Sequence, residues 1–232
     1  MQQTSTKCSK FVSDTLQCSV CKGLCKKHGK TANNKQRYQC KNCKKTFISQ
    51  YTYNAYKNDT TTWITNLLKE GSGIRSIGRL LLISNTTVLK RILITAEAIT
   101  KPVTFLHKSY KVDEVCTYCK SKGKKIWIVY ALQKDNKQVA DFAVGGRTKK
   151  TLRKVTDTLV LSKPEKIFTD KLNLYGFIIP KSIHCTCQYG TNRIERKNIN
   201  LRTHLKRLNR RTICFSKSIV FLVACLKIYF WA

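Results

Sequence analysis

Two kinds of side chain in this sequence could hold metal ions: paired cysteines near the start and isolated carboxylates further along. Cys18 and Cys21 are separated by two residues, and Cys40 and Cys43 repeat that spacing after eighteen intervening residues. Four thiolates in this pattern satisfy tetrahedral Zn²⁺ completely and leave no position open for chemistry. The pattern therefore predicts a structural zinc site, and metal binding would supply much of the folding free energy of so small a segment.

Other cysteines also lie near one another in the sequence: Cys8, Cys25, Cys116, Cys119, Cys185 and Cys187. One of the first two could replace a member of the four-cysteine pattern, which is the alternative to the site above. The other four stand in two close pairs. Because residues i and i+3 of one strand point to opposite faces, we expect small core or surface cysteines there rather than a second zinc site.

The carboxylates are few, because twelve Asp and Glu stand against forty-five Lys and Arg. Glu195 is the only acidic residue after Asp170, and it lies in the strongly basic stretch 192–211. On a helix this stretch would carry an apolar stripe opposite its cationic face: Ile194, Leu201, Leu205 and Leu208. Glu195 either forms surface ion pairs, worth about 0.3 to 0.5 kcal/mol each, or binds a metal within a phosphate-binding surface.

The elements that would position these carboxylates begin at Tyr110, where the sequence pattern becomes typical of β-strands. We expect strands at residues 110–118, 125–132, 138–144, 167–168 and 177–183, and helices at 149–161 and 192–211. The first three strands would form an antiparallel meander. Three antiparallel strands, a helix, two strands and a closing helix are the order of an RNase H-like α/β domain.

In that order Asp113 lies on the first strand, Asp170 ends the fourth, and Glu195 lies on the closing helix. Neighbouring central strands would bring Asp113 and Asp170 together, and the helix could lay Glu195 across them. Three such carboxylates repel one another unless divalent cations lie between them. Two Mg²⁺ ions about 3.5 to 4 Å apart could activate an attacking oxygen and stabilise a leaving one. The alternative is that each is a solvated charge, as for Glu114, whose side chain would point to the other face of its strand.

Residues 60–100 carry a helical period instead. The apolar stripes of three short helices are Trp63, Ile64, Leu67 and Leu68; Ile74, Ile77, Leu80 and Leu81; and Val88, Leu89, Ile92 and Leu93. Ser84 or Asn85 could cap the third helix. A helix-turn-helix of this kind would present four polar side chains to a major groove: Thr86, Thr87, Lys90 and Arg91. The alternative is a three-helix packing unit with a solvated basic face.

A formal charge of +33 and a pI near 10.0 indicate a polyanionic partner and strongly salt-dependent binding. A membrane-surface protein would need an amphipathic anchor, which the sequence lacks before its last residues. The first residues, MQQTSTKCSKF, lack the apolar core of a secretory signal. Residues 219–226 form an apolar run too short to span a membrane, and we expect a packed terminal helix or strand there. A reducing, cytoplasmic and nucleoid-associated location is therefore expected.

Several segments together resemble the transposases of the insertion sequence one family, along almost the whole chain. They are CSVC with QRYQCKNCKKTF, GSGIRSIGRLL, VDE at Asp113, FTDKLNLY at Asp170, NRIERKNINLRTHLKRL around Glu195, and FSKS at residues 215–218. The resemblance implies that the zinc ribbon and helix-turn-helix bind the inverted-repeat ends of an element. It also implies that Asp113, Asp170 and Glu195 form a triad of the DDE kind that cuts and joins DNA, with Arg202 contacting DNA.

The sequence thus predicts an α+β protein of three domains: a zinc ribbon (1–57), a helix-turn-helix domain (58–101) and an RNase H-like catalytic domain (102–232). We expect hydrolysis at each element end and attack of the freed 3′ hydroxyl on target DNA, with Mg²⁺ at the triad and structural Zn²⁺. The cations that would frame DNA at the triad are Arg193, Arg196, Lys197 and Arg202. The expected partners are double-stranded DNA, as element ends and target, and further copies of the chain in a homodimer or larger assembly, without a membrane. The alternatives are a DNA-binding repressor with an inactive catalytic domain and a nuclease of the same fold.

Overall fold

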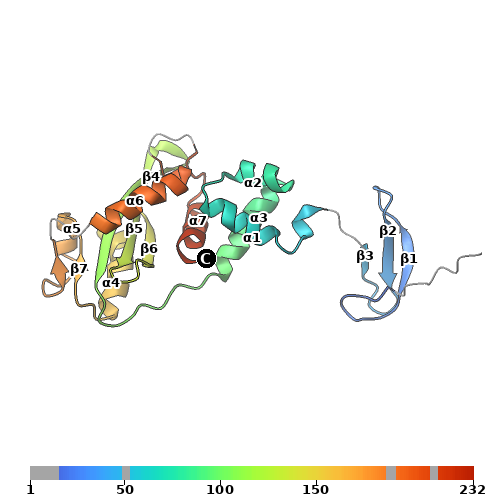
Figure 1. The fold of residues 1–232 in the computed structure, drawn as a ribbon, viewed down its shortest axis with the longest axis horizontal. Helices are drawn as coiled ribbons and strands as arrows, with labels where there is room; N and C mark the ends of the chain where they lie inside the picture. The colour runs from blue at the N-terminus through green and yellow to red at the C-terminus, as the bar shows by residue number, and fades with distance from the viewer. Residues whose placement is uncertain (1–15, 49–52, 187–191, 210–213) are drawn as a thin grey trace, which may run out of the picture. The chain divides into compact units, whose positions relative to one another are not determined.

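The computed structural model describes residues 16–48, 53–186, 192–209 and 214–232 (Figure 1). The chain divides into two compact units, Met1–Tyr56 and Lys57–Ala232. The first boundary lies one residue from the expected end of the zinc ribbon. The helices predicted as a helix-turn-helix belong to the same compact unit as the large sheet, so the separate domain expected at 58–101 remains a prediction.

The first unit is built on a small antiparallel sheet in the order β1-β2-β3. Its strands are β1 (Cys25–Lys30), β2 (Gln36–Cys40) and β3 (Thr46–Ile48). Among the described residues from 16 to 48, the only buried apolar side chains are Cys18 and Cys40, which are 1% and 0% exposed. So little buried apolar area cannot stabilise a fold of this size without a further contribution such as a bound metal.

Three helices begin the second unit: α1 (Thr60–Lys69), α2 (Ile74–Leu81) and α3 (Asn85–Ala98). Ser84 is the N-cap of α3, and its side-chain oxygen accepts the backbone N–H of Thr87 at 3.1 Å. Gly78 of α2 lets the turn before α3 pass close by, because a Cβ there would lie 3.0 Å from the carbonyl oxygen of Ile83 and 2.6 Å from Oδ1 of Asn85. The apolar stripes are narrower than expected, since Trp63 and Leu80 are 56% and 63% exposed.

A five-stranded mixed sheet follows, in the order β6-β5-β4-β7-β8. Its strands are β4 (Tyr110–Cys119), β5 (Ser121–Gln133), β6 (Val139–Gly145), β7 (Ile167–Phe168) and β8 (His184–Cys185). Strands β4, β5 and β6 form the expected antiparallel meander, whereas β4, β7 and β8 are parallel. The central strand β4 therefore has an antiparallel neighbour on one side and a parallel neighbour on the other.

Helices cover both faces of this sheet (Figure 1). They are α4 (Lys149–Leu161) and α5 (Asn173–Gly176) on one face, and α6 (Asn192–His204) with the 3₁₀ turn η2 (Lys206–Leu208) and α7 (Ile219–Trp231) on the other. Val112 packs with α4, whereas Val115 packs with α6 and α7. Because successive side chains alternate between faces, Asp113 faces the α6 side of β4 and Glu114 faces the α4 side.

The strand expected at residues 177–183 is wrong. The backbone N–H groups of Ile178 and Ile179 both donate to the carbonyl of Tyr175, so the segment continues α5 as helical turns. Pro180 then has no N–H to offer a neighbouring strand, and the N–H of Ile183 closes a turn on its carbonyl. Pairing with β7 is thus limited to the two residues of β8.

The closing helix is also shorter than the stretch expected for it. Helix α6 ends at His204, and Leu205 begins the tighter turn η2. Residues 210, 211, 212 and 213 lie outside the described residues. The apolar stripe that was expected along this stretch is nevertheless buried against the sheet, at Ile194, Leu201, Leu205 and Leu208.

The last apolar run is a helix, α7, which continues beyond the expected residues as far as Trp231. It is apolar on several sides because it packs both against the sheet and against α3. The ring of Phe230 stacks on Tyr130 of β5 at 5.7 Å, and Nζ of Lys227 donates to the carbonyl of Ala96 at 3.3 Å. Of the helices that the structure describes, none is both long and apolar enough to cross a membrane.

Candidate functional site

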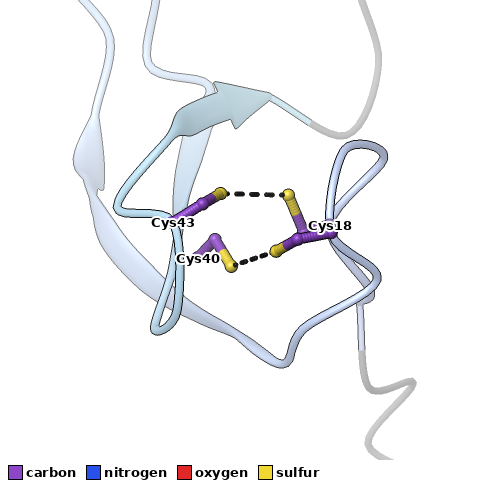
Figure 2. A group of neighbouring side chains, drawn as sticks. Cys18, Cys40 and Cys43 are labelled. Atoms are coloured by element: carbon purple, nitrogen blue, oxygen red, sulfur yellow. Dashed lines mark hydrogen bonds between the residues drawn. The ribbon is translucent and has the colours of Figure 1, made fainter.

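The four predicted zinc ligands meet in the first unit, and Figure 2 shows Cys18, Cys40 and Cys43 of this group. Their sulfur atoms and that of Cys21 all lie within 4.8 Å of one another. The Cys18 and Cys43 sulfurs are 3.6 Å apart, and the Cys21 and Cys40 sulfurs are 3.4 Å apart. Tetrahedral zinc with bonds of about 2.3 Å places its sulfur ligands about 3.8 Å apart. The cysteine group therefore has the donor type and spacing that such an ion requires.

Backbone N–H groups in the two Cys-x-x-Cys turns favour the thiolate form. The N–H groups of Cys21 and Val20 lower the pKa of the Cys18 thiol. The N–H of Cys43 lowers the pKa of Cys40 to about 6, against the opposing effect of burial. Because the thiolate is the form that binds metal, the turns prepare Cys18 and Cys40 for an ion. Burial and hydrogen bonds to the other three thiols instead raise the pKa of Cys43 to about 11.

None of the other cysteines that the structure describes enters this group. Sγ of Cys25 lies 3.5 Å from the carbonyl of Gly23, and burial raises the pKa of its thiol. Cys8 and Cys187 lie outside the described residues. Cys119 is buried and Cys116 and Cys185 are half-buried, and within the described part of the chain they join no second cluster of metal-ligand type.

The second group consists of carboxylates. One oxygen from each of Asp113, Glu114 and Asp170 lies within 4.8 Å of the others. Lys111 of β4 pairs with Phe168 of the parallel strand β7, and Asp113 and Asp170 each come two residues after that pair. Parallel strands thus carry both aspartates to one place, as their predicted positions on neighbouring strands implied.

Asp113 is held on both of its oxygens. Its Oδ1 accepts the backbone N–H of Glu114 at 2.7 Å, and its Oδ2 accepts Nδ2 of Asn198 at 2.6 Å. The hydroxyl of Tyr130 donates to Oδ1 of Asn198 at 2.6 Å, which fixes that amide. Burial raises the pKa of Asp113 to about 6, and the charges of Glu114 and Asp170 add to the effect, although both hydrogen bonds oppose it.

Glu114 approaches from the other face of β4, and its side chain is only 1% exposed. Its Oε2 accepts Nη2 of Arg147 at 3.0 Å and Nε at 3.3 Å, and its Oε1 accepts the hydroxyl of Tyr175. The guanidinium of Arg147 lies 4.5 Å from the centre of the Trp127 ring. Arg147 thus compensates the charge of Glu114, whereas among the described residues Asp113 forms no ion pair.

Glu195, the third predicted member of the triad, is exposed on the first turn of α6. Within the described residues it is not part of the three-carboxylate group. Its charge instead raises the pKa of the Lys111 ammonium, which burial and nearby cations lower. Asn198, three residues and about 4.5 Å further along the helix, occupies the place that faces Asp113.

The donors of the acidic group suit a hard divalent cation, which prefers oxygen ligands. Asp113 and Asp170 offer carboxylate oxygens close enough to share an ion. Burial raises the pKa of Asp113, and the charges of Glu114 and Asp170 add a smaller effect in the same direction. A bound cation would favour the ionised form of Asp113. The group therefore fits divalent cations better than it fits three ionised carboxylates alone.

The cations predicted to frame DNA divide between two sides of α6. Arg193, Arg196 and Lys197 line a cavity of about 570 Å³ together with Leu132, Lys137 and Asn200. By helical spacing, Arg202 lies instead on the side of Glu195 and Asn198. Lys197 is partly withdrawn from solvent, because its Nζ lies over the Tyr229 ring at 5.6 Å and burial lowers its pKa.

The predicted recognition residues of α3 also differ in their surroundings. Thr86 and Lys90 are exposed, whereas Thr87 and Arg91 are half-buried. The hydroxyl of Thr87 lies 2.7 Å from that of Ser84, and Nη1 of Arg91 donates to Oγ1 of Thr61 on α1 at 3.4 Å. Thr86 and Lys90 therefore present their side chains to solvent, while the other two contact the helical unit itself.

The family model of the IS1 transposase matches residues 109–229, which is more than half of the chain. The chain belongs to the IS1 transposase family. The insertion element iso-IS1n protein InsB of Shigella dysenteriae is 37% identical over 109 residues, which cover 47% of this chain and 83% of that protein. The IS1 protein InsB of Shigella flexneri is 34% identical with the same coverage. The IS1 2 protein InsB of Escherichia coli K12 is 35% identical, with 65% of its length covered.

Membership identifies a DNA transposase, an enzyme that acts on DNA. Among solved structures, the simian T-cell lymphotropic virus intasome in complex with the PP2A regulatory subunit B56 gamma matches with 12% identity and a TM-score of 0.33. That match covers 71% of this chain and 64% of the other, and its score is too low to support an argument. The family match spans the large sheet, the acidic group, α6 and most of α7.

Two residues of the transposase's acidic site were not singled out from the sequence: Arg147 and Tyr175. Glu114 was noticed there only as a solvated charge on the far face. A buried carboxylate requires a cation or a hydrogen-bond donor close by. The expected position of Glu114 on an inner face of the strand was therefore the signal that such partners exist. Nothing in the local pattern around Arg147 or Asn198 indicates that they reach β4.

Proposed function

We propose that this transposase cuts DNA at the ends of its insertion sequence and joins the freed 3′ ends to target DNA at the acidic group. The observation that carries the proposal is the meeting of Asp113, which lies on β4, with Asp170, which follows the adjacent parallel strand β7. The strand order β6-β5-β4-β7-β8, with helices on both faces, supports an RNase H-like assignment for this part of the chain.

Each residue of the site would have a separate task. Asp113 and Asp170 would hold two Mg²⁺ ions, with Glu195 as the third carboxylate of a DDE triad. Bound there, these ions would supply Lewis-acid stabilisation of the attacking and leaving oxygens. Asn198 keeps Oδ2 of Asp113 in place through its hydrogen bond. Glu195 would have to turn away from Lys111 to complete the triad, since it lies outside the group described above.

The remaining predicted contacts would hold DNA around this site. Thr86 and Lys90 of α3, with Thr87 and Arg91, would read the inverted-repeat ends, and a zinc-bound ribbon at Cys18, Cys21, Cys40 and Cys43 would add affinity. Arg193, Arg196, Lys197 and Arg202 would contact phosphates, which makes binding depend on salt. Because two ends must be held together for joining, a homodimer or larger assembly is part of the proposal.

The test uses purified protein, Mg²⁺ and duplexes that carry the element's own ends. The proposal expects cleaved and joined products from the wild type, and loss of both from Asp170→Asn with end binding retained. Binding without any product from the wild type would favour a repressor, and cleavage without joining would favour a nuclease. Activity that survives Asp170→Asn would remove the acidic group from the mechanism.

The third carboxylate needs its own comparison, because Glu114 is nearer to the aspartates than Glu195 is. A direct role for Glu195 predicts that Glu195→Gln abolishes product formation. The control is Glu195→Asp, which keeps the charge on a shorter side chain and should retain a measurable fraction of the rate. Full activity of Glu195→Gln would leave Glu114 as the third carboxylate.

A further inference from the structure

We propose that Arg147 binds a backbone phosphate of the DNA strand held at the acidic group, with Glu114 and Trp127 fixing its guanidinium for that task. The inference deepens the proposed function and rests on it, because it places the reacting DNA at Asp113 and Asp170. Arg147 belongs neither to the predicted triad nor to the cations of α6.

The guanidinium of Arg147 is held from two directions. Nε and Nη2 both donate to Oε2 of Glu114, at 3.3 and 3.0 Å. The group also lies over the ring of Trp127, 4.5 Å from its centre. Tyr175 fixes the carboxylate itself by donating to Oε1. An arginine held by a carboxylate and an aromatic ring loses little further freedom when it binds a ligand, so its remaining donors are pre-organised.

The two members of the Glu114–Arg147 ion pair differ in exposure, and the arginine is the one that reaches solvent. The Glu114 side chain is 1% exposed, whereas that of Arg147 is 37% exposed. A guanidinium has five N–H donors in a planar fork, and Glu114 uses only the Nε side of it. Nη1 and the second N–H of Nη2 remain after that pairing, and two adjacent donors of this kind match the oxygens of a phosphate.

The location of Arg147 suits the strand that reacts. Its partner Glu114 has an oxygen within 4.8 Å of those of Asp113 and Asp170, so the guanidinium lies one side chain away from the acidic group. It precedes α4, whose N-cap is Thr148. Lys149 on the first turn of α4 lies over the ring of Phe177 at 4.5 Å, and Lys171 directly follows Asp170. Lys171 lines a cavity together with Phe177, so both lysines lie near this ring.

A purely structural ion pair is the rival explanation. Ion pairs buried in a protein usually repay little more than their desolvation, so stability alone gives no reason to expose one member beside the site. The two explanations differ in one respect that can be measured. A structural pair affects all phosphates of a bound duplex alike, whereas a phosphate ligand affects one phosphate far more than the rest.

The experiment measures binding of the full-length protein to duplexes carrying the element's end, with Ca²⁺ in place of Mg²⁺ so that the DNA stays intact. Each phosphate around the cleavage position is replaced in turn by a neutral methylphosphonate. Wild-type protein should lose affinity about tenfold or more at the phosphate that Arg147 contacts. Arg147→Gln should bind the unmodified duplex correspondingly less tightly and lose nothing further at that one position.

The matched control is Arg153→Gln, which removes an exposed arginine of α4 that lies further from the acidic group. It should retain the full methylphosphonate loss at the position assigned to Arg147. If Arg147→Gln shows the same profile as the wild type across every phosphate, Arg147 contacts none of them and the proposal is wrong.

A second variant guards against misfolding, because Arg147→Gln leaves the buried Glu114 carboxylate without its cation. The pair Glu114→Gln with Arg147→Gln removes both charges and keeps an acceptor for Tyr175. This double variant should fold with a near-native Tm and still show no loss of affinity when the phosphate assigned to Arg147 is replaced by methylphosphonate. If the pair had only a structural role, the double variant would show the wild-type loss at that position. Arg147→Lys keeps the charge but not the fork, and should recover only part of the affinity.

The outcomes separate this inference from the proposed function. If Asp170→Asn abolishes cleavage while Arg147→Gln keeps the wild-type phosphate profile, the acidic group stands and the Arg147 assignment fails. If Asp170→Asn cleaves normally, the proposed function fails whatever the profile of Arg147→Gln, and the phosphate that Arg147 contacts belongs to a DNA path elsewhere.

Discussion

The cysteine group of the first unit and the acidic group of the second are both suited to metal ions, yet they are assembled differently. The four sulfurs come from two short turns within twenty-six residues, from Cys18 to Cys43. The two aspartates come from strands whose sequence positions are more than fifty residues apart. All four predicted ligands of the first group lie together. One predicted member of the second group, Glu195, lies instead outside that group, on the first turn of α6.

This difference agrees with the tasks proposed for the two groups. A structural ion needs all its ligands from the protein, so local turns that aim N–H groups at thiolates are sufficient. A site that handles DNA must leave positions for substrate oxygens and must therefore tolerate uncompensated charge. Burial, with a smaller contribution from the charges of Glu114 and Asp170, raises the pKa of Asp113, and such a raised pKa is the cost expected of a site that keeps positions open for DNA.

Removing the metal from the cysteine group should have the largest effect. Cys40→Ser takes away a buried ligand, and because the first unit has so little other apolar core, that unit should unfold completely. Loss of zinc by elemental analysis and rapid proteolysis within residues 1–56 would measure this. The second unit should keep its melting transition. Retention of a protected first unit in Cys40→Ser would show that the metal does not hold it together.

Changing the acidic group should instead abolish the reaction and leave the fold intact. Asp170→Asn is expected to lower the cleavage rate at least about 10³-fold, which corresponds to about 4 kcal/mol of transition-state stabilisation. Circular dichroism and end binding should stay close to wild type. A cleavage rate of Asp170→Asn within tenfold of wild type would mean that the acidic group does not carry out the reaction.

The stability of the second unit should depend on pH through Asp113. Its pKa is raised from 3.8 to about 6, so the folded state binds a proton that the unfolded state releases between about pH 4 and 6. The stabilisation is complete below pH 4 and is lost as pH rises through 6, by about 3 kcal/mol. Urea unfolding in EDTA should show this slope in the wild type.

Asp113→Asn supplies the control for that slope, because an amide does not titrate in this range. The difference in unfolding free energy between the two proteins should change between pH 4 and 7, even if the amide itself alters stability by a constant amount. Added Mg²⁺ should flatten the wild-type slope, since a cation favours the ionised carboxylate. Parallel pH profiles for both proteins would contradict the raised pKa.

The smallest effect is expected at Cys25, which lies beside the cysteine group without joining it. Cys25→Ala should leave the zinc content unchanged and the first unit protected from proteolysis. Cys21→Ala is its matched comparison and should lose the ion. Loss of zinc from Cys25→Ala would mean that Cys25 replaces one of the four ligands, which was the alternative that the sequence left open.

The sequence predicted those features that depend on local pattern. Alternating residues located β4, β5 and β6 to within a few positions, the helical period gave α4 at residues 149–161, and a serine before α3 supplied its cap. The strand prediction at residues 177–183 was wrong because β-branched and aromatic residues favour strands only where a partner strand exists. Pro180 and the turn at Tyr175 prevent pairing with a partner strand there. Local propensity gives way there to tertiary context.

The candidate site was predictable only in part, for a related reason. The meeting of Asp113 and Asp170 followed from strand order. The helical register of α6 against β4 is set by which apolar side chains enter the core, and it places Asn198 rather than Glu195 opposite Asp113. The contact between Arg147 and Glu114 joins residues thirty-three positions apart across a sheet, and no periodicity in the chain encodes it.

Helix α7 packs against the sheet on one side and against α3 on the other. If α3 reads the element's end and the acidic group cuts, the spacing between the recognised bases and the cut bond is set by a packed helix. That spacing then does not depend on the segment from residue 99 to residue 109, which joins α3 to β4 along the chain. The second unit would then fix the distance between the recognised bases and the cut bond. Smaller side chains at the contact of α7 with α3 would make the cleavage position less precise before they weakened DNA binding.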